Sequence, residues 1–219
     1  MQTSKAFIQN FKRGGEKLLD RIITTDETWL HHFDPETKIE SSIWKHRGSP
    51  PKKPKVAKSV GKQMYIFFAD RHGMILVHAV PSGLTVNAAY YSKVLRRDLV
   101  KAIKKKRPAM AVDLGNIILH QDNAPAHTAA STCLEIEHLG FNLLEYPPYS
   151  PDLAPMDIAI FPFIKSQLRG VRFEKSDELK YATRTIISKI DSKWYSDVFD
   201  SWLRRCEKCL QCKGDYVEK

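Results

Sequence analysis

The sequence predicts an α/β fold: a mixed five-stranded sheet with helices on both faces, followed by further helices toward the C-terminal end. Two observations predict it. Short runs rich in β-branched and aromatic residues alternate with longer segments of helical periodicity, in the order strand, strand, strand, helix, strand, helix, strand, helix. The 219 residues are 42% hydrophobic, which is enough for one large domain with a sizeable core.

The first three strands come from the N-terminal third of the chain. Residues 21–25 predict a strand because isoleucine and threonine favour β structure, and residues 41–45 are a weaker candidate. Residues 63–69 and 74–80 are apolar runs separated by the turn-like insert 70–73, so together they predict a β-hairpin.

Alternating helices and strands follow the hairpin. Residues 87–107 have helical spacing, with one broad apolar face made of Ala88, Tyr91, Val94, Leu95, Leu99 and Ile103. Residues 116–121 predict the fourth strand. Residues 126–139 predict a helix that Gly140 ends, and residues 141–146 predict the fifth strand.

The remaining elements are helical. Residues 155–168 predict a helix with proline in its first turn and Gly170 just past its end. Residues 177–190 and 192–210 add two C-terminal helices. This order of elements is that of an RNase H-like fold.

Three aspartates stand out in this strongly basic chain: Asp26, Asp122 and Asp157. Asp26 ends the first expected strand, Asp122 follows the fourth, and Asp157 begins the helix at 155–168. Because sites in open α/β sheets collect at strand ends, we expect the three acids to meet there. Three carboxylates suit two Mg²⁺ ions acting on a phosphodiester, since Mg²⁺ takes few carboxylates and leaves room for water and phosphate.

Each aspartate also has a purely structural interpretation. Asp26 could be a helix cap or a surface residue. Asp122 could be an Asx-turn residue, because Asp-Asn and proline favour turns. Asp157 competes with Asp152, five residues earlier, which we interpret as a turn or cap residue.

Several neighbouring side chains are better explained by structure than by chemistry. Glu27 would point to the opposite face of its strand from Asp26, and we expect His127 to be a hydrogen-bonded packing residue rather than a phosphate contact. Cys206, Cys209 and Cys212 are spaced like part of a zinc cluster. Positions three apart also share one helix face, and we favour reduced thiols on the inner side of a terminal helix.

The segments around the aspartates resemble mariner-type transposases of the Tc1/mariner superfamily. Residues 24–29 read TTDETW, residues 120–127 read HQDNAPAH and residues 149–155 read YSPDLAP. Between the second and third acids lie residues 123–156, which number 34, the spacing that is the hallmark of that family. The resemblance runs from about residue 18 to the end, and the chain is also similar to the transposase part of SET-mariner fusion proteins.

The resemblance implies a D…D…D catalytic core in which Asp26, Asp122 and Asp157 are catalytic and hold two Mg²⁺ ions, with Mn²⁺ expected to substitute. It implies two-metal-ion phosphodiester hydrolysis at transposon ends and strand transfer into target DNA at TA sites, in the nucleus. The alternative is a catalytically inactive, transposase-derived DNA-binding or assembly domain. The intact acids argue for the enzyme. Met156 and Ile158 leave room for the alternative, because the family often has serine or asparagine before the third acid and an aromatic residue after it.

Two basic segments are candidate DNA contacts, since the net charge of +10 favours polyanions. Residues 45–62 interleave prolines and glycines with cations and form either a polar loop or an extended arm. In the family the matching insertion resembles a clamp that reaches the other subunit, so we expect a homodimer through the 45–62 arm. The second segment, 96–107, ends a helix whose dipole also favours cations. The candidate DNA-binding residues are Lys52, Lys53, Lys55, Lys58, Arg96, Arg97, Lys104, Lys105 and Lys106.

We expect residues 1–20 to be the remnant of an N-terminal linker, residues 21–175 the RNase H-like core with its clamp-like insertion, and residues 176–219 a helical extension of the same domain. Full transposases carry N-terminal helix-turn-helix modules, so this layout indicates a catalytic fragment, a truncated copy or one domain of a longer product. No apolar run approaches the roughly 20 residues that span a bilayer, and residues 1–10 lack the apolar segment of a leader. We therefore expect DNA, and no membrane, as the partner.

Overall fold

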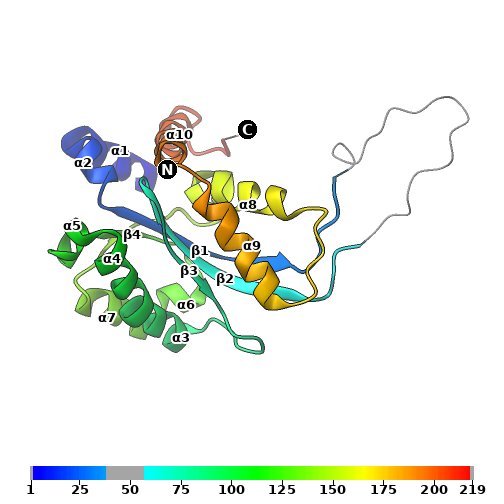
Figure 1. Cartoon of the computed structure of the whole chain (residues 1–219). Helices are drawn as coiled ribbons and strands as arrows, with labels where there is room; N and C mark the ends of the chain where they lie inside the picture. The colour runs from blue at the N-terminus through cyan, green and yellow to red at the C-terminus, as the bar shows by residue number, and fades with distance from the viewer. Residues whose placement is uncertain (1, 38–56, 218–219) are drawn as a thin grey trace, which may run out of the picture.

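The computed structural model describes residues 2–37 and 57–217, which form one mixed sheet between two layers of helices (Figure 1). The strand order is β3-β2-β1-β4-β5. Strands β1, β2 and β3 are antiparallel, and β4 and β5 run parallel to β1. The strands are β1 (Ile22–His31), β2 (Lys62–Asp70), β3 (Gly73–Ala79), β4 (Ile118–His120) and β5 (Asn142–Leu144). The expected five-stranded mixed sheet and its hairpin are confirmed.

The two faces of the sheet bury different side chains because residues along a strand alternate in direction. Ile66 and Phe68 of β2 belong to the apolar cluster under the helices between β3 and β5. Tyr65 and Phe67 belong to the cluster on the opposite face, under the helices that follow β5. Both faces of β2 are therefore in the core, as its nearly continuous apolar sequence requires.

One face is covered by the helix expected at 87–107, together with two shorter helices (Figure 1). Asn87 caps its start, since its side chain accepts a hydrogen bond of 2.9 Å from the Tyr90 N–H. The helix expected at 126–139 is divided at Ala129, whose ψ of 140° is extended. The elements on this face are α3 (Ala88–Lys93), η1 (Val94–Leu99), α4 (Val100–Lys106), α6 (Pro125–Thr128) and α7 (Ala130–His138).

The other face carries the C-terminal helices (Figure 1). Gly170, with φ of 75°, follows the end of α8 as the sequence predicts. The first turns of the helix expected at 155–168 are wound as a π-helix, which widens the backbone around Asp157. These elements are η4 (Met156–Ile160), α8 (Phe161–Leu168), α9 (Ser176–Ser188) and α10 (Ser192–Gln211). Short helices α5 (Pro108–Ala111), η2 (Leu114–Asn116) and η3 (Pro151–Leu153) lie in the connections.

The N-terminal residues differ from the expected linker. They form α1 (Gln2–Gly14) and α2 (Glu16–Leu19), and α1 packs against α10. The Phe7 ring stacks on the Trp202 ring with centroids 4.6 Å apart. Phe7, Ile8 and Phe11 lie at helical spacing and supply the apolar face, although the segment is polar on average. The division of residues 21–219 into core and extension stays a prediction.

A further difference concerns the first strand. We expected it to end at Asp26, but β1 continues to His31 and pairs with β2 along its whole second half. Thr28, Trp29 and Leu30 continue the β-favouring sequence, so Asp26 lies in mid-strand, opposite Phe67.

Part of the expected structure lies outside the described residues. This holds for the weak strand at 41–45, for Lys52, Lys53 and Lys55, and for most of the 45–62 arm with its proposed dimer contact. Among the helices of residues 2–37 and 57–217, none combines the length and the apolar character that a bilayer crossing requires.

Candidate functional site

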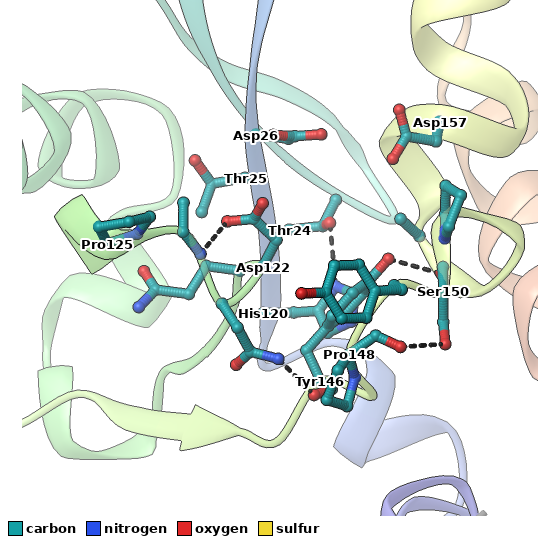
Figure 2. Close-up of a pocket in the computed structure, with 16 residues that line it drawn as sticks. Thr24, Thr25, Asp26, His120, Asp122, Pro125, Tyr146, Pro148, Ser150 and Asp157 are labelled. Carbon is teal, nitrogen blue, oxygen red and sulfur yellow. Dashed lines mark hydrogen bonds between the residues drawn. The ribbon is translucent and has the colours of Figure 1, made fainter. Parts of the chain in front are cut away.

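The three aspartates line one cavity of about 530 Å³, although they lie far apart in the sequence. Asp26 comes from β1, Asp122 from the segment after β4, and Asp157 from η4 (Figure 2). The parallel pairing of β1 with β4 aligns Thr24 with His120, and this register brings the first two carboxylates to the same part of the sheet. The structure therefore brings together all three acids that the sequence singles out.

Local hydrogen bonds fix two of the carboxylates. The Asp26 Oδ1 atom accepts a hydrogen bond of 2.7 Å from the Glu27 N–H. The Asp122 Oδ1 atom accepts one of 3.0 Å from the Ala124 N–H, the Asx-type turn that the Asp-Asn-Ala-Pro sequence favours. Asp122 is thus both a turn residue and a member of the cavity, so its two interpretations are compatible.

Burial and mutual repulsion perturb the acids. Burial raises the pKa of Asp26 to about 8, and the charges of Asp157, Glu27 and Asp122 add to the rise. Burial also raises the pKa of Asp157, which the Lys165 ammonium partly offsets. The hydrogen bond from His127 holds the pKa of Asp122 below its usual value. At neutral pH Asp26 therefore keeps a proton, and a bound cation would favour its release.

The donor set fits a hard divalent cation. All three acids offer carboxylate oxygens, which are the ligands that Mg²⁺ prefers. Across residues 2–37 and 57–217, no three side chains of His, Cys, Asp or Glu are placed to hold one ion together. One or two carboxylates per ion, completed by water and phosphate oxygens, is the arrangement common for Mg²⁺, and the residues fit such a site.

A buried histidine connects the cavity to the other face of β1. His127 is 1% exposed and lies between two acids, with Nδ1 2.6 Å from Asp122 Oδ1 and Nε2 3.2 Å from Glu27 Oε1. Burial alone would lower its pKa, but the hydrogen bonds to Asp122 and Glu27 outweigh burial and raise the pKa of His127 to about 10. His127 is hence the hydrogen-bonded, buried residue we expected, and its charged form orients the Asp122 carboxylate.

The sequence did not indicate that two further residues, Lys165 and Tyr149, lie near the cavity. Lys165 lies on α8 and its charge acts on Asp157, eight residues earlier. Helical residues four apart share a face, so the spacing of 157, 161 and 165 is a signal that could have revealed this pair. Tyr149 also lines the cavity, but only tertiary structure shows its exposure.

The candidate DNA-binding residues that the structure describes differ in whether their side chains are already paired. Lys58 pairs with Asp34 at 3.3 Å, and Arg96 pairs with Glu135 at 3.3 Å. The Lys106 ammonium donates a hydrogen bond of 2.9 Å to the Met74 carbonyl in β3. These three cations are therefore already paired with other groups of the same chain. The other candidates in the second basic segment, Arg97, Lys104 and Lys105, are exposed, and so is Lys101 of the same segment.

The cysteine run packs largely as expected. Cys206 and Cys209 are buried in the cluster that joins α1 and α10, and burial raises the pKa of the Cys206 thiol to about 12. Cys212 is exposed, which corrects the expectation for that residue. Cys212 is the C-cap that follows the last residue of α10, past the buried face of the helix.

Comparisons with known proteins find that the chain is similar to transposases. The family model described as "Transposase (partial DDE domain)" matches residues 34–112. The Mariner Mos1 transposase of Drosophila mauritiana is 30% identical over 217 residues, which are 99% of this chain and 61% of that protein. The human histone-lysine N-methyltransferase SETMAR is 28% identical over 204 residues, 93% of this chain and 29% of that protein. The chain thus spans about three-fifths of the first relative and less than a third of the second.

Solved structures agree with these relatives. The catalytic domain of Mos1 mariner transposase matches with a TM-score of 0.81 and 29% identity, covering 99% of this chain and 93% of that one. A pre-cleavage Mos1 transpososome matches with a TM-score of 0.90 and 30% identity, covering 99% of this chain and 62% of that one. The likeness confirms the RNase H-like fold that the order of elements predicts.

Proposed function

Because this chain belongs to the mariner-type transposases, we propose that it is the catalytic domain of a DNA transposase. The reaction would be phosphodiester hydrolysis at a transposon end, followed by attack of the freed 3′-hydroxyl on target DNA at TA sites. The single observation that carries the proposal is the convergence of Asp26, Asp122 and Asp157 in one cavity. Three acids that perturb one another at a shared site are expected where a catalyst binds cations.

The geometry supports a role for each residue of the proposed site. Asp26, Asp122 and Asp157 would hold two Mg²⁺ ions, or Mn²⁺ in their place. Such ions, when bound, supply Lewis acidity and a nucleophile at neutral pH. Charged His127 keeps the Asp122 carboxylate oriented, as outer partners of ligating groups commonly do. The Lys165 ammonium offsets negative charge at Asp157, which eases the approach of a phosphate.

The proposed partners are DNA and a second copy of this chain. Several solved Mos1 structures are complexes of paired transposon ends, including one with the left transposon end. For this chain we propose binding to transposon ends and target DNA, dimerisation through the 45–62 arm, and action in the nucleus. The net charge of +10 supports binding to a polyanion.

The test is a nicking assay with the purified chain and supercoiled plasmid. We expect conversion to open circles that depends on Mg²⁺ or Mn²⁺ and stops with EDTA, leaving 3′-hydroxyl ends. Labelling by a terminal transferase would identify those ends. A chain that binds the plasmid but never nicks it would instead be a transposase-derived DNA-binding or assembly domain.

Metal binding should depend on pH. Asp26 has a pKa of about 8, so below that pH a cation must displace its proton, and binding weakens as the pH falls. We expect Mn²⁺ affinity to drop up to roughly tenfold per pH unit between about pH 8 and pH 6. Calorimetry in two buffers with different ionisation enthalpies will measure the released proton. The Asp26→Asn variant is the control, because it has no proton to release at this position.

DNA binding should be electrostatic. Each phosphate contact lowers the logarithm of affinity by about 0.9 per tenfold increase in salt. Neutralising Arg97, Lys104 and Lys105 together is expected to flatten this slope, because these exposed cations are available to phosphates. Arg96→Gln is the matched control, since that guanidinium already pairs with Glu135. A triple variant whose slope equals that of the parent would remove these three cations from the DNA interface.

A further inference from the structure

A groove follows the outer edge of the sheet along β3 and shares no lining residue with the carboxylate cavity. Strand β3 is the last strand on its side, so among the described strands only β2 pairs with it. The groove has a volume of about 650 Å³, and consecutive residues of β3, 73–77, line it. At about 3.3 Å per residue, this edge has room for an added strand of similar length.

Two helices form the walls of this β3-edge groove, one from each layer of the fold. Helices α4 and α9 both contact β3, and they cover opposite faces of the sheet (Figure 1). Apolar side chains from the strand and from both helices line the space between the walls, namely Leu76, Val77, Ala102 and Ile187. A free strand edge with side-chain pockets beside it is the geometry in which an extended peptide adds to a sheet.

The lining of the β3-edge groove is basic. Among the described residues that line it, none is aspartate or glutamate. Its basic side chains are His72, Lys105, Lys106, Arg107 and Arg184. The Arg107 guanidinium is held by Asp70, whereas Lys106 and Arg184 are exposed and belong to opposite walls. Because complementary charge favours association, the groove suits a segment with acidic side chains.

One hydrogen bond shows how the strand edge is satisfied without a partner strand. The Lys106 ammonium donates a hydrogen bond of 2.9 Å to the Met74 carbonyl of β3. A backbone N–H of an added strand would replace the ammonium at this carbonyl. The ammonium would then pair with an acidic side chain of the added segment, so neither group would be left without a partner.

We propose that the β3-edge groove binds an extended segment of a partner protein that carries both acidic and apolar side chains. The backbone of that segment would continue the sheet beyond β3. Its acidic side chains would meet Lys106 on one wall and Arg184 on the other, and its apolar side chains would cover Ala102 and Ile187. A DNA backbone would use the cations but neither the apolar walls nor the strand edge, so a polypeptide fits the groove better.

The test measures binding of a fluorescent peptide to the full chain by anisotropy, in EDTA. The peptide has about eight residues and repeats Glu-Glu-Val-Val, because successive side chains of a strand face opposite sides and both walls then meet acids and valines. We expect it to bind, and we expect no binding when lysine replaces glutamate. Methylating the backbone nitrogens of alternate residues gives two further peptides. The one whose methyl groups face β3 should bind at least about tenfold more weakly, and the other should bind like the unmodified peptide.

A pair of double variants tests the two walls. Lys106→Gln with Arg184→Gln removes one charge from each wall, and we expect the peptide to bind about 2- to 30-fold more weakly. Lys101→Gln with Lys180→Gln is the matched control, since these lysines lie on the same two helices but outside the groove. We expect parental peptide affinity in this control, and urea unfolding will verify that both double variants are folded.

Several outcomes would overturn the proposal. The parent would fail to bind the glutamate peptide, or it would bind the lysine peptide equally well. Equal effects of the two methylation patterns would exclude strand addition, and equal effects of the two double variants would exclude the groove. Weaker binding of duplex DNA by Lys106→Gln with Arg184→Gln, at unchanged peptide affinity, would assign these cations to DNA instead. None of these outcomes depends on nicking, so the proposed function is tested separately.

Discussion

Replacing Asp26 by asparagine will abolish metal-dependent nicking and, at the same time, stabilise the metal-free fold. Asparagine resembles the protonated acid but cannot ligate a cation through a charged oxygen, so we expect at least about a thousandfold loss of nicking. The gain in stability has a separate cause. The carboxylate is disfavoured in the fold by burial and by Asp157, and an amide avoids that cost.

The raised pKa of Asp26 determines that Asp26→Asn stabilises the metal-free fold and does not destabilise it. The pKa of Asp26 is about 8 in the fold and about 3.8 as a reference, so the folded state holds the proton more tightly. Between those values the folded protein binds more protons than the unfolded chain, and its stability falls as the pH rises. Asp26→Asn removes this decline. We expect a gain of about 1–3 kcal/mol near neutral pH, measured by urea unfolding in EDTA.

Asp152 supplies the matched control for this experiment. It lies in the same region of sequence as Asp157, but its Oδ2 atom accepts a hydrogen bond of 2.9 Å from the Val217 N–H, and it does not line the cavity. Asp152→Asn should keep nicking and gain no stability, whereas Asp157→Asn should behave like Asp26→Asn. Nicking by Asp26→Asn or Asp157→Asn at the parental rate would contradict the assignment of the carboxylates.

The Arg107→Ala variant will lose about 3–5 kcal/mol of unfolding free energy, because it leaves a buried charge without its partner. Asp70, at the end of β2, is 0% exposed. Its carboxylate receives two hydrogen bonds from the Arg107 guanidinium, of 2.6 Å from Nε and 2.8 Å from Nη2. This bidentate contact links the β2–β3 hairpin to Arg107, the residue that follows α4.

A double-mutant cycle gives this prediction its control. Asp70→Asn removes the charge, so adding Arg107→Ala to it should cost much less than Arg107→Ala alone. Arg107→Lys keeps the charge but loses the planar fork, and we expect an intermediate cost. Urea unfolding followed by circular dichroism measures the parent and all four variants. Equal costs of Arg107→Ala with and without Asp70 would show that packing, and not the ion pair, holds the hairpin.

Elements with strong local patterns were predictable from the sequence. The hairpin of β2 and β3 is confirmed because two apolar runs flank a polar turn, and the long helix from Asn87 is confirmed because its apolar positions repeat every turn. The break at Ala129 had no local signal. Helix α1 was missed because its mean polarity hides a narrow apolar face that only α10 covers.

The carboxylates of the candidate site were predictable from the sequence, whereas their surroundings were not. The three aspartates were identified from their segments and their spacing, and the structure places them in one cavity. The connection through His127 was not predictable, since Glu27 and His127 are 100 residues apart and meet only across the sheet. The exposure of Tyr149 likewise depends on how Tyr216, from the other end of the chain, packs against its loop.

The packing of α1 on α10 has a consequence for handling the protein. The two helices close one apolar cluster in which Phe7 covers Trp202 and Cys206 lies beneath. Trimming the chain at the first β-strand would uncover that indole and that thiol together. The shortened protein would keep every carboxylate of the cavity. It would, however, expose an apolar surface with an oxidisable thiol to other molecules in solution. Aggregation and intermolecular disulfides in such a sample would therefore report on the lost helix and not on the chemistry of the site.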